Sequence, residues 1–588
     1  MGEKGDWMPD ILLQDCLMER MGIVEEDYVN LLNQEEYRHW EARMQILHCI
    51  TFGETERAEA LLGAYEETCD INKPLERQFY LAMKAQVRRS RGGSGEELSA
   101  LFEEAAGMTV PREAWGKLSK LALSVKELNL LLEAEKYRRE GERPQRYREV
   151  ADYIEGSEME NIARVRIYPK AVYFMCRCML QNRREDAEWD GEALLGYCRR
   201  AVALLRQNKR MYYLWEILDL MGKLAALTAE KMRGRGQGEK VQALEVLYQE
   251  QAEWKNALVE LYREWKVPRE TTDFCYLYVM KNVYCVNDVI RIRRNMFGLS
   301  QKELCSGICS VKTLRRLEQG STNPHRKTAA QLLERLGIPG EFTRTELVTE
   351  RPEAWRLMEQ LHDSMNKGEW EAADRLRVYI QKMVSMEIPL NRQTLMREAL
   401  LIRWRKGELA AEEYCTRMQE VLELTLPCHT VLQEGKKFLT GEEQSCILNW
   451  MQGMDGNSEE YLLWTRRLEE IYQPYIEAGL WEGIWNRYEL VAEHVGGACG
   501  DRGDYDRADW YRGFILRGCL YFRRMGSIHH SLYDRWRNND MQKRRCILPD
   551  RTLDEEEELS KCILFSILAE DRRSEDFYRR KLEAIRKR

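Results

Sequence analysis

The sequence predicts an all-α protein in which two helical arrays flank a small, basic helical domain. Three observations predict it: turn-forming residues are scarce, apolar residues recur every three or four positions, and one basic segment interrupts an acidic chain. The 588 residues include only 13 Pro and 38 Gly, and the good helix formers Glu, Leu, Arg and Ala are abundant. This length allows three or four domains of roughly 150 residues each, or one long repeat array.

Composition narrows the class of protein. The chain is 44% apolar and 32% charged, the balance of a folded protein. No run of about 18 apolar residues is present, so we expect no membrane-spanning helix. The first residues lack the apolar stretch of a signal peptide, and we therefore expect a cytoplasmic protein. The 17 cysteines are scattered, and in a reducing compartment they indicate small buried hydrophobic side chains.

The sequence offers no constellation for catalysis. The phosphate-binding, dinucleotide-binding and nucleophile-elbow motifs GxxxxGK[ST], GxGxxG and GxSxG are missing. No CxxC pair occurs, and the eight histidines lack ligand spacing apart from the adjacent His529-His530. We therefore expect no metal, no cofactor and no enzymatic activity, and a surface or half-buried position for the histidines.

The first array is expected over residues 1–283. Apolar side chains such as Ala58, Leu62 and Tyr65 follow a helical spacing, and short turns of Gly and an acid, such as Gly53-Glu54, precede many helices. A helix with a small Ala near its start resembles the second helix of a tetratricopeptide (TPR) repeat, although the match to the full repeat is loose.

A second array, over residues 346–588, repeats the first. Residues 40–78 align with 355–393 at a shift of 315. The identical pairs include Trp40/Trp355, Gly53/Gly368, Ala58/Ala373, Pro74/Pro389 and Gln78/Gln393. A shift larger by one aligns Thr109 with Thr425 and Glu127 with Glu443. These matches in one register indicate a duplication and not chance apolar similarity.

The basic segment is expected to form a domain over residues 284–345. Within it, residues 286–340 hold ten Lys or Arg and four acids, a net charge of +6, whereas the rest of the chain sums to −13. A local excess of cations in an acidic chain indicates a binding site for a polyanion. The pattern predicts a first helix from Val286 to near Gly298, and a second that begins at Ser300 with an S-x-x-E capping box.

The third helix of this segment, Val311–Gln319, has the features of a DNA-reading helix. Ser310 caps it, Leu314 and Leu317 face inward, and Gly320 ends it. Its outer face carries Val311, Lys312, Thr313, Arg315 and Arg316. Lys312 and Arg316 can reach guanine in the major groove, while Thr313 can contact a phosphate or a thymine methyl group. Gln301 can hold a phosphate beside the start of the second helix. A fourth helix is expected from Asn323-Pro324.

Four stretches of this segment match a known pattern: Gly298–Leu304, Ile308–Ser310, Leu314–Gly320 and Leu336–Pro339. Together they resemble the lambda-repressor-like (Xre-type) helix-turn-helix. The resemblance is greatest to bacterial peptide-sensing quorum regulators of the PlcR and Rgg type. It is specific over the basic segment and only architectural elsewhere. It implies four to five helices, DNA binding, a TPR-like array that binds a short signalling peptide, and a homodimer. It also implies that Arg294 pairs with Glu318 for structural reasons.

Two departures from the family stand out. The DNA-binding domain is central here and usually N-terminal there. Arg293 occupies a position where the family buries Leu or Ile, so either the small core is weakened or Ile292 takes this place. The sequence therefore supports two hypotheses: a ligand-sensing transcription regulator, or a protein–protein interaction adaptor in which the helix-turn-helix has become one more packed hairpin. Residues that would contact a peptide cannot be assigned.

Overall fold

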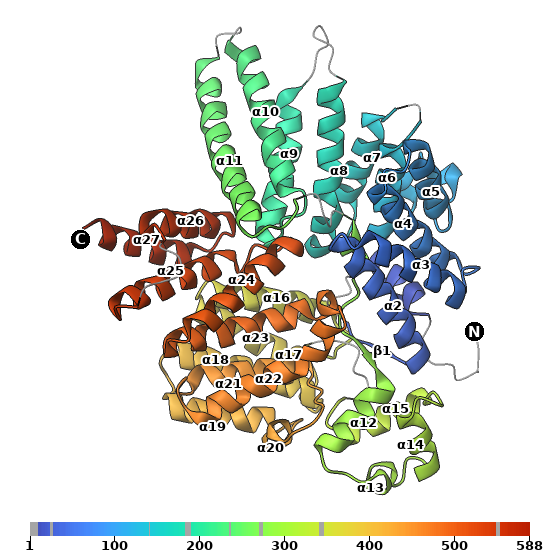
Figure 1. Cartoon of the computed structure of the whole chain (residues 1–588), viewed down its shortest axis with the longest axis vertical. Coiled ribbons are helices and arrows are strands. Elements are labelled where there is room, and N and C mark those ends of the chain that lie inside the picture. The colour runs from blue at the N-terminus through green and yellow to red at the C-terminus, as the bar shows by residue number, and fades with distance from the viewer. Residues whose placement is uncertain are drawn as a thin grey trace. The chain divides into compact units, whose positions relative to one another are not determined.

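The structure, a computed structural model, describes residues 10–23, 28–139, 141–182, 190–233, 237–269, 274–339, 346–547 and 553–587. In these residues 27 α-helices dominate, with three short 3-10 helices and two three-residue strands, so the prediction of an all-α fold is confirmed (Figure 1). No helix among the described residues has the length and apolar character needed to span a membrane. No disulfide joins the cysteines, all of which lie among the described residues, and all but Cys309, Cys415 and Cys546 are buried.

The described residues of the first half form eleven helices. Their bounds are α1 Ile11–Arg20, α2 Gln34–Thr51, α3 Thr55–Thr68, α4 Pro74–Ser90, α5 Gly95–Gly107, α6 Val125–Lys136, α7 Pro144–Gly156, α8 Asn161–Gln181, α9 Gly191–Gln207, α10 Leu214–Arg233 and α11 Gly238–Glu264. The 3-10 helices are η1 Arg112–Ala114, η2 Leu118–Lys120 and η3 Cys275–Leu277. From α3 to α11, most helices pack against the next one in sequence, as in a repeat array.

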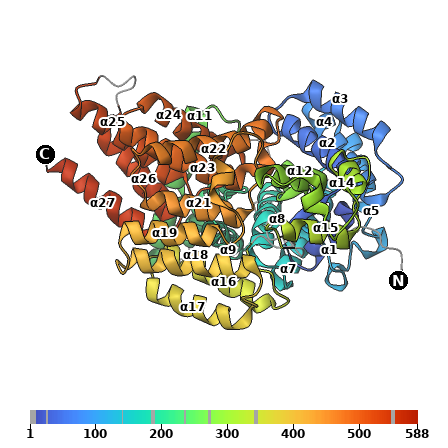
Figure 2. The ribbon, with the colours of Figure 1, turned by 90° about the horizontal axis from the view of Figure 1, so that it is seen from below.

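The basic segment and the second array follow. The basic segment forms α12 Val286–Met296, α13 Gln301–Cys305, α14 Val311–Glu318 and α15 Arg326–Arg335. The second array comprises α16 Pro352–Asn366, α17 Trp370–Met383, α18 Pro389–Arg405, α19 Ala411–Leu422, α20 Cys428–Leu432, α21 Gly441–Gly453, α22 Glu459–Glu477, α23 Trp481–Arg502, α24 Tyr505–Tyr521, α25 Ile528–Arg544, α26 Glu555–Leu568 and α27 Arg572–Arg586. Figure 2 shows α16 to α19 and α21 in stacked rows.

The helix bounds repeat at the shift found in the sequence. Both ends of α3 and α17, and both ends of α4 and α18, are offset by the same shift of 315. Gly53 and Gly368 each adopt a positive φ, 75° and 76°, in the turn before the repeated helix, a conformation that glycine adopts without steric cost. The small residues Ala58 and Ala373 are fully buried at the helix contacts. The duplicated sequence thus folds into duplicated helices.

Contacts between Cα atoms divide the chain into two compact units that do not follow the sequence order. Unit 1 comprises Met1–Ile11, Glu25–Glu41 and Met280–Ala508. Unit 2 comprises Leu12–Val24, Ala42–Val279 and Asp509–Arg588. The basic segment therefore belongs to the same unit as α16 to α23. The C-terminal helices α25 to α27 belong to the same unit as the array of the first half.

The two strands lie beside the basic segment in unit 1. Strand β1, Asn30–Leu32, pairs in parallel with β2, Val283–Cys285, which leads directly into α12. Val29, just before β1, is buried in the hydrophobic core of the basic segment. A segment from near the start of the chain thus completes the entry to this small domain, which the local helical pattern does not predict.

Candidate nucleic-acid interface

Helices α12 to α15 enclose one small hydrophobic core. The predicted inward stripe of α12 is buried, and so are Leu314 and Leu317 of α14 and the apolar side of α15. The core consists of Val29, Val286, Val289, Ile290, Leu304, Cys305, Leu314, Leu317, Ala329, Leu332, Leu333, Leu336, Ile338 and Phe438. Phe438 comes from the second array, so this domain shares its core with the array.

Serine caps position the two helices of the helix-turn-helix. The Ser300 hydroxyl accepts a hydrogen bond from the Glu303 backbone N–H at 3.2 Å, and the Glu303 carboxylate accepts one from the Ser300 N–H at 2.7 Å. This is the predicted capping box, and these hydrogen bonds hold the pKa of Glu303 below its usual value. Ser310 likewise caps α14 by accepting from the Thr313 N–H at 3.0 Å. Gly307, with φ 74°, forms the turn between the two helices.

The outer face of α14 is open. Val311, Lys312, Thr313, Arg315 and Arg316 are all exposed, and so is the cap residue Ser310. No side chain in the described part of the chain forms an ion pair with any of the three cations on this face. The hydroxyl groups of Ser310 and Thr313 lie 2.8 Å apart and hydrogen bond to each other. A short helix with a buried apolar side and an uncompensated basic side fits the major groove of DNA.

Gln301 and Arg294 meet at one carboxylate. The Arg294 guanidinium forms two hydrogen bonds with Glu318, and the Gln301 amide donates to Glu318 Oε2 at 2.7 Å. The pair of Arg294 and Glu318 tethers α12 to the end of α14, a structural role. Gln301, expected at a phosphate, is held by the same carboxylate, and this contact fixes its amide beside the start of α13.

The fourth helix begins later than the sequence suggests. It was expected from Asn323-Pro324, but α15 starts at Arg326 and His325 is its N-cap residue. Pro324 is buried, and residues 323–325 form a non-helical segment before α15. The buried proline holds this segment in place, so the helix begins two residues after it. Ala329, Leu332, Leu333 and Leu336 nevertheless face the core as expected.

Arg293 is buried and does not weaken the core. Its guanidinium forms a two-point ion pair with Glu443, at 2.9 and 3.1 Å, and neither side chain is exposed. It also donates to the carbonyl oxygens of Leu336, Phe438 and Thr425. Its Nε donates to the Leu336 carbonyl oxygen at 3.2 Å, so all three guanidinium nitrogens are hydrogen bonded, as a buried charge requires. The sequence analysis did not predict this role for Arg293. The capping box that Thr440 and Glu443 form placed an acid at the start of a helix, and this acid was a candidate partner for a buried arginine.

We call Gln393, Thr425, Thr440 and Glu443 the arginine socket of the second array. The Gln393 amide donates to the Thr425 hydroxyl, which donates to Glu443, and Thr440 forms the capping box with Glu443. Gly337 lies against the socket with φ 74°, and a Cβ atom there would come within 2.0 Å of the Thr425 carbonyl oxygen. The basic segment, α12 to α15, therefore packs tightly against the second array.

The first array has an equivalent socket, formed by Gln78, Thr109, Ser124 and Glu127. Each of these residues aligns with its counterpart at the shift of 315 or 316. The Gln78 amide donates to the Thr109 hydroxyl at 2.8 Å, and Ser124 forms a capping box with Glu127. The arginine here is Arg20 at the end of α1, which pairs with Glu127 and reaches the Thr109 carbonyl oxygen at 3.5 Å. Helix α1 thus occupies the place that α12 has on the second array.

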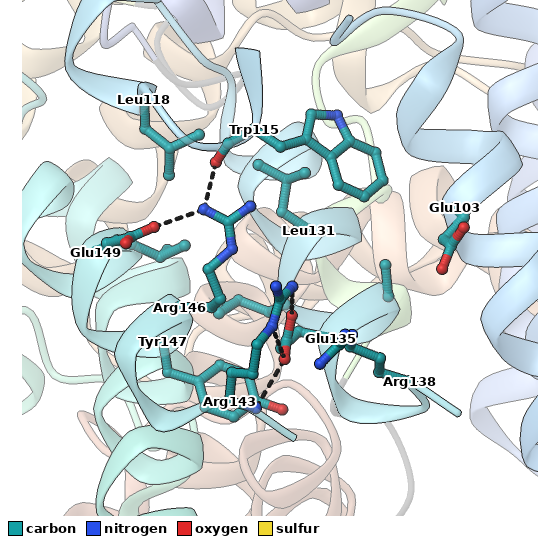
Figure 3. A pocket seen from close by; sticks show the side chains of 13 residues that line it. Glu103, Trp115, Leu118, Leu131, Glu135, Arg138, Arg143, Arg146, Tyr147 and Glu149 are labelled. Carbon is teal, nitrogen blue, oxygen red and sulfur yellow. Dashed lines mark hydrogen bonds and ion pairs between the residues drawn. The ribbon is translucent and has the colours of Figure 1, made fainter. Parts of the chain in front are cut away.

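One small cavity of about 80 Å³ lies in the first array (Figure 3). Its charged walls are internally paired: Arg143 with Glu135 at 2.7 Å, and Arg146 with Glu149 at 2.6 Å and with the Trp115 carbonyl oxygen. This volume would hold two or three water molecules or one side chain of a ligand, and it is too small for a peptide.

One group of potential metal ligands also comes together. His529, His530 and Asp571 bring three ligand atoms within 4.8 Å of one another, although Asp571 is distant in sequence. The protein's own contacts occupy this group: Asp571 caps α27 by accepting from Ser574, and His529 Nδ1 lies 3.1 Å from the Tyr578 hydroxyl. Burial lowers the pKa of both histidines. The arrangement serves the packing of α25 against α27.

Comparison with known proteins identifies the small domain. Residues 290–342 match the family model described as helix-turn-helix, so the predicted resemblance of this segment to a helix-turn-helix is confirmed. No curated protein matches the chain.

Two solved structures share weak overall likeness. The crystal structure of Bacillus thuringiensis PlcR in complex with the peptide PapR7 and DNA is 14% identical, with a TM-score of 0.32, and the alignment covers 50% of this chain and 98% of that one. A circular tandem repeat protein with a novel repeat topology is 11% identical, with a TM-score of 0.10, over 93% of this chain and 94% of that one. At these scores neither likeness informs function.

Proposed function

We propose that the chain is a sequence-specific DNA-binding transcription regulator whose helical arrays bind a ligand. The observation that carries the proposal is the outer face of α14. There, Lys312, Arg315 and Arg316 are exposed and form no ion pair with any described residue, in a domain that matches the helix-turn-helix model. In an adaptor, this hairpin would only pack against other helices, and an exposed row of unpaired cations would add nothing to that packing. The protein binds and does not catalyse, and it acts in the cytoplasm, where bacterial DNA lies.

The residues on this face divide into base-reading and phosphate-holding groups. Lys312 and Arg316 are one helical turn apart and contact guanine O6 and N7. Val311 and Thr313 offer methyl groups to thymine, and Arg315 contacts the backbone. Ser310 and Gln301, at the starts of α14 and α13, hold phosphate groups together with the N–H groups of the helix ends.

The ligand class proposed is a short signalling peptide, as in quorum sensing. Its support is the resemblance of the helix-turn-helix to that of peptide-sensing regulators, together with two arrays that can offer extended surfaces. Ligand binding shifts the equilibrium between conformations of the arrays, and this changes the orientation of the helix-turn-helix domain, α12 to α15, which is docked on the second array.

The test is selection of genomic fragments by the purified full chain at about 150 mM salt, since phosphate contacts alone give binding at low ionic strength. The wild-type protein should select a defined motif. The double variant Lys312→Ala/Arg316→Ala should lose at least about 30-fold in affinity for it, because each base contact contributes about 1–3 kcal/mol.

The matched control is Arg326→Ala/Lys327→Ala, which removes the same charge from exposed positions at the start of α15. It should weaken binding to all sequences alike and leave the motif unchanged. Recovery without a motif, or equal losses in the two double variants, would contradict base reading by α14 and favour the adaptor.

A further inference from the structure

The duplication extends to the last helices of each half. Both ends of α9 and α24 are offset by a shift of 314, and the first residues of α10 and α25 are offset by the same shift. The turn between them also repeats. Lys209 and Arg523 both adopt the left-handed conformation, with φ of 52° and 54°, and each is followed by Arg-Met. Residues 209–211 and 523–525 are thus equivalent positions of the two halves.

These equivalent turns lie against each other inside unit 2. Arg210 and Arg524 form an antiparallel bridge. The Met211 N–H donates to the Arg523 carbonyl oxygen at 2.7 Å, and the Met525 N–H donates to the Lys209 carbonyl oxygen at 3.1 Å. When each half is exchanged for the other, each of these two hydrogen bonds becomes the other one.

Such reciprocity is the property that defines an isologous twofold contact, in which residue i touches j and j touches i. Two copies of one chain normally form it. Here both sides of the contact belong to the same chain, because the sequence contains the two copies in tandem.

Further contacts from the first half to the last helices surround this centre. Tyr262 donates to the Leu520 carbonyl oxygen at 3.2 Å, and Arg206 donates to the carbonyl oxygens of Ile567 and Leu568. Arg535 is mostly buried between Glu264 and Glu558, at 2.6 Å from each. Figure 1 shows α26 beside the end of α11. Buried ion pairs and hydrogen bonds of this kind fix one arrangement of the two ends.

The two halves differ in what precedes the array. The second half begins with a helix-turn-helix, α12 to α15, whereas the corresponding socket of the first half holds α1. The two paired halves therefore contain one helix-turn-helix among the described residues, and not two.

We propose that the last helices of the two halves form, within one chain, the twofold contact that a homodimer forms between two chains, and that the chain presents one reading domain, α12 to α15, to one asymmetric DNA half-site. The half-site part rests on the proposed function. Homodimeric helix-turn-helix proteins read two half-sites about one helical turn apart, so their sites are palindromic. A single reading domain has no such requirement.

The first experiment tests the pairing without DNA. Native mass spectrometry and light scattering should give one chain, 69.7 kDa, and a melting temperature independent of protein concentration, since the pairing is intramolecular. A mixture of unlabelled and ¹⁵N-labelled chains is then treated with a carbodiimide, which joins Lys561 to Glu260, 3.2 Å away in α11. The linked peptides should be wholly light or wholly heavy.

The control for the crosslink is Lys561→Arg, which keeps the charge and cannot be coupled. A mass of two chains, or linked peptides that combine light and heavy isotopes, would show that the pairing joins different chains and would overturn the proposal. If the chemistry yields no linked peptide, the mass and the concentration dependence of melting still decide between one chain and two.

The second experiment examines the selected DNA. The motif should be one half-site without inverted symmetry, occupied by one chain. A palindromic motif bound by two chains would overturn the half-site part. Selection of no motif at all would overturn the proposed function instead, and the pairing would still be decided by the first experiment.

Discussion

The two arginine sockets have the same design and hold different partners. On the first array, Glu127 holds Arg20 at the end of the short helix α1. On the second array, Glu443 holds Arg293 from the middle of α12, inside the DNA-binding domain. The Arg20 side chain is 31% exposed, whereas Arg293 is 0% exposed.

The difference lies in how many parts each arginine joins. Arg293 donates to Leu336 of its own domain and to Thr425 and Phe438 of the array, and so closes the joint between them. Arg20 reaches one carbonyl oxygen, that of Thr109. The duplicated socket is thus fully buried where it holds the helix-turn-helix, and partly open where it holds α1. Matched variants of the two halves test whether the sockets differ in strength.

The largest effect is expected from Arg293→Met. It leaves Glu443 buried without a cation, which costs about 3–5 kcal/mol. The matched change Arg20→Met should cost less, about 2 kcal/mol, because Arg20 is 31% exposed and water can take its place beside the buried Glu127. Hydrogen exchange of the full chain measures both, at α12 to α15 for Arg293→Met and at α1 for Arg20→Met. Equal losses at the two sites would show that the sockets do not differ.

The next effect is expected from Gly337→Ala. The new Cβ atom would clash with the Thr425 carbonyl oxygen, and the positive φ adds strain, for a combined cost of about 3 kcal/mol. Gly298→Ala is the control, because Gly298 has a φ of 64° with open space around it and should cost only about 1 kcal/mol. Hydrogen exchange at residues 425–440 should rise in the first variant alone. A similar rise in both would mean that backbone strain, and not docking, governs this contact.

A smaller effect is expected from Glu443→Gln. Glutamine can keep the capping box with Thr440 through its Oε1, but it removes the charge and replaces the oxygen that accepts from Arg293 and Thr425 by a donor. The docked state should therefore lose about 2–3 kcal/mol. Glu127→Gln makes the same change with Ser124 on the first array. DNA affinity should fall for Glu443→Gln, about tenfold if one tenth of the molecules keep the docked orientation, and stay unchanged for Glu127→Gln. An unchanged affinity in both variants would separate the socket from DNA binding.

The sequence predicted what depends on local pattern. Helical spacing and capping residues indicated the all-α fold, the capped α13 and α14, and the exposed side of α14. It could not predict the partner of Arg293, because Glu443 is distant in the sequence and only the folded array brings it close. The strand pair of residues 30–32 with 283–285 and the position of Phe438 in the domain core were missed for the same reason. Contacts between distant segments leave no periodic trace.

The smallest effect concerns a titratable network that only the second array has. His362 Nε2 lies 3.2 Å from Glu398, and Arg397 links Glu398 to Glu442. The first array has Leu47, Met83, Ala82 and Lys126 at these positions. Burial lowers the pKa of His362, but Glu346 and Glu398 outweigh burial and raise it from 6.5 to about 9.

Because this pKa is higher in the folded than in the unfolded chain, the protonated imidazole stabilises the fold. The stabilisation is complete below pH 6.5, where both states are protonated, and is lost as the pH rises through about 9. Between pH 6 and pH 9.5, the free energy of unfolding measured with urea should therefore fall more in the wild type than in His362→Gln. The control Leu47→Gln lies in the first array, which lacks this network. It should lower the free energy of unfolding by the same amount at both pH values. Parallel losses in the wild type and His362→Gln would mean that other groups carry the pH dependence of the second array.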